Sequence, residues 1–80
     1  DALALDAAVF ERERRRALAD AVRRLPGRQR ELLAEVLRRP CSTYDEISAA
    51  LEMPLGSIGP TRERAFGRLR RDRALAGALA

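Results

Sequence analysis

The stretch that decides the fold is TYDEISAALEMPLGSIGPTRERAFGRL, residues 43–69. It opens with a capping box, in which the Thr43 hydroxyl accepts from the third helical N–H and Glu46 reaches back to the capping residue. Pro54 and Gly56 then mark a turn, because proline cannot continue a helix and glycine tolerates unusual dihedral angles. A short capped helix, a brief turn and a second helix predict a helix-turn-helix. The expected buried face of the first helix of this pair consists of Ile47, Ala50 and Leu51.

The second helix of the pair has two contrasting faces. We expect Ser57 to cap it and Pro60 to lie in its first turn, where a missing N–H costs little. At 100° per residue, its apolar sector comprises Ile58, Ala65 and Leu69. A basic sector on the other side comprises Arg64, Arg68 and Arg71. Arginine suits DNA recognition because its planar fork binds guanine edges or phosphates through two hydrogen bonds.

The rest of the chain predicts two more helices. Asp6 can cap a helix over 7–24, and the Leu25-Pro26-Gly27 break starts another that ends near Arg38. Strand signals are nearly absent, so we expect an all-α, four-helix domain with no strands to form a wing. The expected organisation is a linker end over 1–5, a helix-turn-helix domain over 6–76 and a tail over 77–80.

Charge is distributed unevenly along the 80 residues. Residues 1–56 hold ten arginines and ten acidic residues, whereas residues 57–73 hold six arginines and two acidic residues. The later segment therefore accounts for the whole net charge of +4. A basic stripe on one helix is the electrostatic footprint of a nucleic-acid-binding module.

The composition argues against several other classes. The chain has no histidine and one cysteine, Cys41, so we expect no zinc site, no internal disulfide, no cofactor and no enzyme activity. No apolar run is long enough for a membrane span and no secretory signal is visible, so we expect a cytoplasmic protein. Because it begins with Asp1 rather than Met, we expect it to be a piece of a longer protein.

Four pieces of the chain carry a family resemblance. They are LPGRQRE at 25–31, YDEISAAL at 44–51, MPLGSI at 53–58, and the pairs Arg64-Ala65 and Leu69-Arg70. In this order and spacing they resemble region 4 of the sigma-70 family, whose patterns are Leu-Pro-x-x-x-Arg-Glu, Tyr-x-Glu-Ile-Ala-x-x-Leu and Pro-x-Gly-(Ser/Thr)-(Ile/Val). The compact form is similar to the extracytoplasmic-function (ECF) group.

This resemblance implies a part of a bacterial transcription initiation factor. In the family, region 4 recognises the minus-35 element of promoter DNA and docks on the flap of the RNA polymerase β subunit. An anti-sigma factor is a further implied partner. Neither a small-molecule substrate nor a membrane partner is implied.

The recognition helix departs from the family pattern at two places. Gly59 and Pro60 stand where the family often has a basic or polar pair, and Thr61 precedes Arg62 where an arginine often precedes an apolar residue. Base readout is therefore expected to fall on the residues that follow. The residues expected to contact DNA are Tyr44, Ser57, Thr61, Arg62, Arg64 and Arg68.

Two other functions fit the same sequence. One is the helix-turn-helix domain of another regulator, such as a response regulator, which usually works as a dimer on paired half-sites. The other is a region 4-like module that mainly binds a protein partner, because Gly59 and Pro60 offer no side-chain hydrogen bond.

Overall fold

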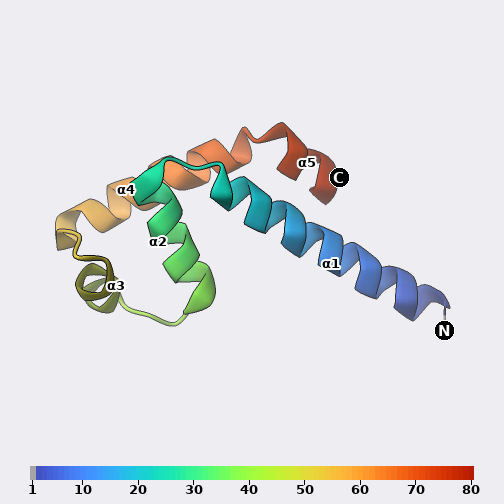
Figure 1. Ribbon diagram of the computed structural model, residues 1–80, viewed down its shortest axis with the longest axis horizontal. Coiled ribbons are helices and arrows are strands. Elements are labelled where there is room, and N and C mark those ends of the chain that lie inside the picture. The colour runs from blue at the N-terminus through green and yellow to red at the C-terminus, as the bar shows by residue number, and fades with distance from the viewer. Residues whose placement is uncertain (1) are drawn as a thin grey trace.

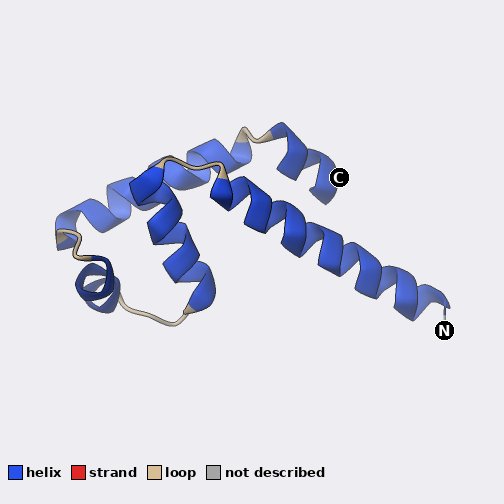
Figure 2. Cartoon of the chain, in the orientation of Figure 1, coloured by secondary structure: helices blue, strands red, loops and turns tan. Residues whose placement is uncertain are grey.

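The chain folds into five helices, with no strands among the residues described (Figures 1 and 2). The computed structural model describes the backbone of residues 2–80 and the side chains of residues 6–80. The helices are α1 (Ala2–Arg23), α2 (Gly27–Arg38), α3 (Tyr44–Leu51), α4 (Leu55–Arg70) and α5 (Arg73–Leu79). The all-α prediction is confirmed, but the predicted number of four helices is wrong.

The first helix begins earlier than predicted. α1 starts at Ala2 rather than Ala7, so residues 2–5 of the expected linker are helical and Asp6 lies inside the helix. Asp1 lies outside the described residues. The alanines and leucines that dominate the first eight positions are strong helix formers, so the helix extends past Asp6, the predicted cap.

The fifth helix is the feature that the sequence reading missed. α4 ends where the Arg71 N–H turns back to the carbonyls of Arg68 and Leu69. Asp72 then caps α5, because its carboxylate accepts from the backbone N–H of Leu75 at 3.0 Å. The expected tail over 77–80 therefore lies almost wholly within α5. An aspartate followed by good helix formers was the signal for this helix.

Two apolar clusters share α2 and α4. The outer cluster joins α2, α3 and α4 through Leu32, Ile47, Met53 and Ile58, with Val36 and Leu51 at its edge. The inner cluster joins α1, α2, α4 and α5 through Ala21, Val22, Leu25, Leu33, Ala65, Leu69 and Leu75. Neighbouring leucines of α2 thus point into different clusters, which makes α2 and α4 the central pair of the fold.

The molecule is elongated because α1 extends beyond the other helices (Figure 1). Its radius of gyration is 14.7 Å, against about 12 Å expected for a compact domain of this length. Residues 6–16 are all exposed, Phe10 included, and burial of α1 begins only at Ala17, in the half that packs against α5. None of the described helices has the length and apolar composition needed to cross a membrane.

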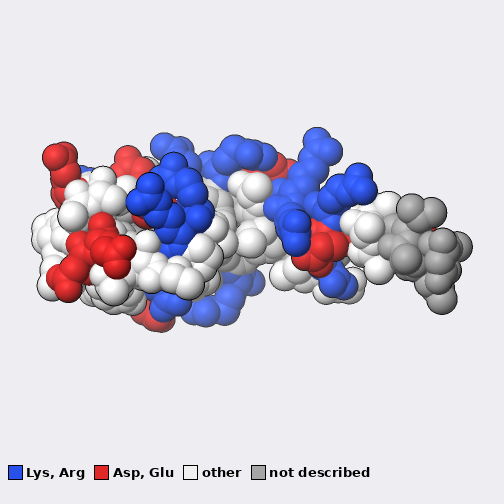
Figure 3. Space-filling model, turned by 90° about the horizontal axis from the view of Figure 1, so that it is seen from below, with Lys and Arg blue, Asp and Glu red and all other residues white. Residues whose placement is uncertain are grey.

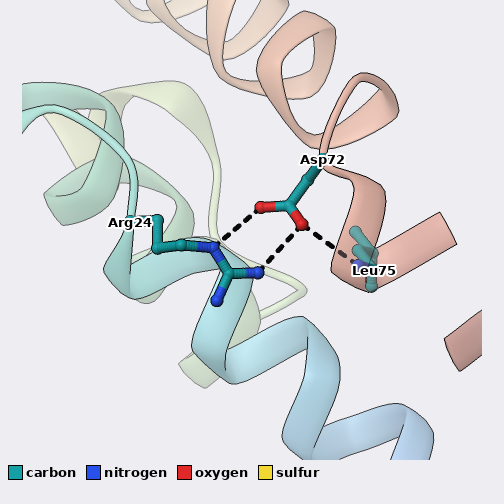
Figure 4. A network of polar contacts seen from close by, with 3 residues as sticks. All are labelled: Arg24, Asp72 and Leu75. Atoms are coloured by element: carbon teal, nitrogen blue, oxygen red, sulfur yellow. Dashed lines mark hydrogen bonds and ion pairs between the residues drawn. The ribbon is translucent and has the colours of Figure 1, made fainter. Parts of the chain in front are cut away.

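A bidentate ion pair connects the end of α1 to the start of α5 (Figure 4). Arg24 Nε and Nη2 donate to Asp72 Oδ2 and Oδ1, both at 2.9 Å, while Oδ1 also accepts from Leu75. The hydrogen bond to Asp72 raises the pKa of Arg24 above its ordinary value. The bonds from Arg24 and then from the Leu75 N–H lower the pKa of Asp72. One carboxylate therefore both caps α5 and holds it beside α1.

Leu32 should be indispensable for stability, since its side chain is 0% exposed at the centre of the outer cluster. Replacement by alanine leaves a cavity, and we expect L32A to lower the free energy of unfolding in urea by about 2–5 kcal/mol. The matched control is Leu37→Ala, because Leu37 lies on the same helix but is 49% exposed. Equal losses in the two variants would contradict this assignment of the core.

The Arg24–Asp72 pair should make stability depend on pH in the acid range. A carboxyl whose native pKa is lowered stabilises the fold above its ordinary pKa of about 4, and this contribution is lost as the pH falls through the native value. Asp72→Asn retains an N-cap but removes the charge. We expect its midpoint of thermal unfolding to be below that of the wild type at pH 7, and the difference to shrink as the pH falls through the lowered native pKa of Asp72. A constant difference across this range would rule out the charge as the cause.

Candidate nucleic-acid interface

The predicted capping box fixes the start of α3. Thr43 Oγ1 accepts from the Glu46 N–H at 3.2 Å, and the Thr43 N–H donates to Glu46 Oε1 at 3.3 Å. This confirms the sequence-based prediction and places Tyr44 at the first helical position, exposed at the surface. The buried side of α3 is only partly as expected, because Ile47 is buried and Leu51 half-buried but Ala50 is exposed.

The turn between α3 and α4 differs from the predicted one. The left-handed residue is Glu52, with a φ of 53°, and its N–H donates to the Ser48 carbonyl. Pro54 occupies the N-cap of α4, so Gly56 lies inside the helix with ordinary dihedral angles. The prediction that Ser57 caps α4 is wrong, since its hydroxyl instead donates to the Pro54 carbonyl at 2.8 Å. The helix starts three residues earlier than a Ser57 cap would place it, because Glu52 and Met53 complete the turn.

Contacts from α2 fix the position of this turn. Arg28 Nη1 donates to the carbonyl of Leu51 at 3.0 Å, which puts a positive charge at the carboxyl end of α3. Met53 is buried beside Leu32 in the outer cluster. The relative position of α3 and α4 is therefore fixed by α2 and not by the turn alone.

The buried face of α4 is the predicted one with one addition. Ile58, Ala65 and Leu69 are all buried, as the helical spacing indicated. Thr61 is buried as well, at 5% exposed, and its hydroxyl lies 3.4 Å from Arg64 Nη2, which donates to it. The expectation that Thr61 reads bases is therefore corrected, because a side chain on the core side of α4 has no access to a base edge.

The remaining predicted contact residues lie on two sides of α4. Arg62 and Tyr44 line one hollow, together with Pro40 and Ile47, where α3 and the loop before it meet α4. The Arg62 guanidinium also lies over the Phe66 ring, 4.9 Å from its centroid. This cation–π contact fixes the position of the guanidinium at the edge of α4.

Arg64 and Arg68 line a second hollow on the opposite side of α4. Its other residues are Gln29 of α2, Glu63, Gly67 and Arg71. Within the described part of the chain, the side-chain oxygen of Gln29 is buried without a hydrogen-bond partner. Sequence reasoning missed Gln29, and no local pattern points to it, since α2 brings it to α4 through tertiary packing.

The arginines of the two halves of the chain differ in their partners. The six ion pairs formed by described residues use Arg15, Arg23, Arg24, Arg28, Arg38 and Arg39. None of these pairs includes an arginine of residues 62–73. Arg38 and Arg39 both pair with Glu35, a buried carboxylate on α2, so their role is structural. The i, i+3 and i, i+4 spacings were the signal for that pairing.

α3 is acidic, whereas α4 is basic. Asp45 and Glu46 are exposed in its first turn and Glu52 is exposed just after it, with no arginine in this helix. Figure 3 shows acidic side chains gathered at the end of the molecule where α3 lies, and basic side chains over the middle. A polyanion would therefore be attracted to α4 and repelled from the start of α3.

No protein-family model, curated protein or solved structure matches this chain.

The positive φ of Glu52 should cost stability that a glycine at this position would recover. An L side chain at positive φ costs about 1 kcal/mol relative to glycine, so we expect Glu52→Gly to raise the free energy of unfolding by up to about that amount. The control is Glu63→Gly, since Glu63 is exposed within α4 and glycine there should cost about 1 kcal/mol. Urea denaturation of both variants would measure the effects, and destabilisation by both would contradict the assigned turn.

Proposed function

We propose that this chain is a DNA-binding module that inserts α4 into the major groove. The short capped α3, the turn at Glu52 and the longer α4 support a helix-turn-helix, in which the second helix reads base edges. The observation that carries the proposal is the set of exposed arginines on α4, none of them in an ion pair with a described carboxylate. Phosphates would supply the missing negative charges.

The particular function that we propose is promoter recognition by region 4 of an ECF-like sigma factor. The four sequence motifs that resemble this family support it, and two of them, YDEISAAL and MPLGSI, lie on α3 and across the turn into α4. The target would be the minus-35 element, and the protein partners would be the β flap of RNA polymerase and an anti-sigma factor. This role implies action in the cytoplasm.

A module of this size should bind DNA weakly on its own. A single small interface buries little surface, and most of its affinity comes from phosphate contacts. Tethering to the polymerase would raise the effective concentration at the promoter. The free domain should therefore show micromolar rather than nanomolar binding at physiological salt.

Removing one of the unpaired arginines should weaken DNA binding in a salt-dependent way. We expect Arg64→Gln to lower the slope of log K against log salt by about 1, as one phosphate contact is lost. Fluorescence anisotropy of labelled minus-35-like and random duplexes at several salt concentrations measures this slope. The matched control is Arg14→Gln, which makes the same charge change on the protruding part of α1.

The two duplexes separate promoter readout from general electrostatic attraction. Promoter recognition requires tighter binding to the minus-35-like duplex, with Arg14→Gln behaving as the wild type. Equal reductions in the Arg14 and Arg64 variants would indicate a nonspecific charge effect. Absence of salt-dependent binding to any duplex would contradict the proposal.

A second candidate function is a module that mainly binds a protein partner. The acidic first turn of α3 and the lack of polar side chains at Gly59 and Pro60 favour it. In that case the Arg64→Gln variant would keep its partner affinity, and no duplex would be preferred.

A further inference from the structure

The first two turns of α4 expose almost no hydrogen-bonding side chain. Leu55 is 50% exposed, Gly56 and Pro60 are exposed, and Gly59 is half-exposed. The hydroxyl proton of the half-buried Ser57 is already donated to the Pro54 carbonyl. The tip of α4 (Leu55, Gly56, Gly59 and Pro60) is therefore a smooth apolar surface.

Two of these four residues, Gly56 and Pro60, face away from the core, and Leu55 and Gly59 lie beside them. At 100° per residue, Gly56 and Pro60 lie roughly opposite the buried Ile58 and Ala65, and Leu55 and Gly59 lie along the adjacent edge. The two hollows that hold Arg62 and Arg64 lie on either side of this surface along the next turn. An apolar strip is thus flanked by positive charge on both sides.

The two glycines of the tip have no explanation within the fold. A Cβ built on Gly56 or Gly59 would meet nothing within 4 Å, and neither residue has a positive φ. Each glycine inside a helix costs about 1 kcal/mol relative to alanine, so neither packing nor conformation accounts for them. Without side chains at these two positions, the helix backbone is accessible to a ligand.

We propose that the tip of α4 reads DNA through the C5-methyl groups of thymine. This inference rests on the proposed insertion of α4 into the major groove. Thymine methyls are the apolar groups that a DNA base pair presents there, and the exposed side chains of this surface offer a base apolar contact rather than hydrogen bonds. Leu55 and Pro60 would touch the methyls, and Gly56 and Gly59 would let the backbone approach the base edges.

Charge complementarity favours DNA over a protein as the occupant of this surface. Arg62, Arg64 and Arg68 lie on the turns that follow the tip and have no described ion-pair partner. Phosphates on the two strands that border a major groove match cations on both sides of an inserted helix. The apolar strip and the arginines on either side of it are therefore complementary to the same ligand, the major groove of DNA.

Deoxyuridine provides the direct test, because it keeps every hydrogen bond of thymine and lacks only the methyl group. Anisotropy titrations would compare a minus-35-like duplex with the same duplex in which deoxyuridine replaces every thymidine. We expect affinity to fall about fourfold for each methyl that is contacted, while the salt slope stays the same. Leu55→Ala should reduce this difference between the duplexes, whereas Leu37→Ala, of similar exposure, should preserve it.

A second variant tests the role of the glycines. Gly56→Ala should raise the thermal midpoint, because alanine favours the helix and the added Cβ meets nothing, yet it should weaken binding to the thymine duplex. If Gly56→Ala were more stable but bound DNA with unchanged affinity, the proposed close approach of the backbone to the base edges would be overturned.

The outcomes distinguish this inference from the proposed function. Equal affinity of the wild type for the thymine and deoxyuridine duplexes, with a normal salt slope, would overturn methyl readout and leave DNA binding intact. Absence of binding to both duplexes would overturn both proposals.

Discussion

The packing of α2 against α4 is the constraint on which the other contacts depend. Leu32 and Ile58 are the largest fully buried side chains, and they meet in the outer cluster that positions α3. One residue further along α2, Leu33 belongs to the inner cluster, which receives α1 and α5. Because both clusters use the same two helices, a disturbance at their contact would loosen the site and its support together. Small domains bury limited area, so few contacts can substitute for this one.

α4 is helical at its tip despite a sequence that disfavours a helix. Residues 55–60 read LGSIGP, with two glycines and a proline whose nitrogen cannot donate to the Gly56 carbonyl. Burial of Ile58, together with Met53 just before the helix, offsets this poor propensity through tertiary packing. A conflict between local propensity and the adopted structure is typical of functional sites. Here the conflict lies at the tip of α4, where Leu55, Gly56 and Pro60 are exposed.

Local and periodic features of this fold could be predicted from the sequence, and tertiary ones could not. The Thr43–Glu46 capping box and the buried sector of α4 follow from spacings within one helix. α5 was missed because a seven-residue helix needs external support, which comes from Arg24, 48 positions away, and from burial of Leu75. The turn was misplaced because its left-handed residue is a glutamate, where the usual preference indicates glycine. In the site, helical spacing identified the arginine face but not the width of the buried sector, which extends to Thr61.

The division of charge limits how the proposed interface can work. Residues 1–56 contain as many acidic residues as arginines, and six of those arginines are held in ion pairs. The acidic start of α3 repels phosphates, so the DNA backbone would be contacted mainly from α4. An interface confined to one helix has few phosphate contacts and therefore a shallow dependence on salt. Under the proposed function, its specificity would come from the tip of α4, and its occupancy at a promoter from tethering to a larger assembly.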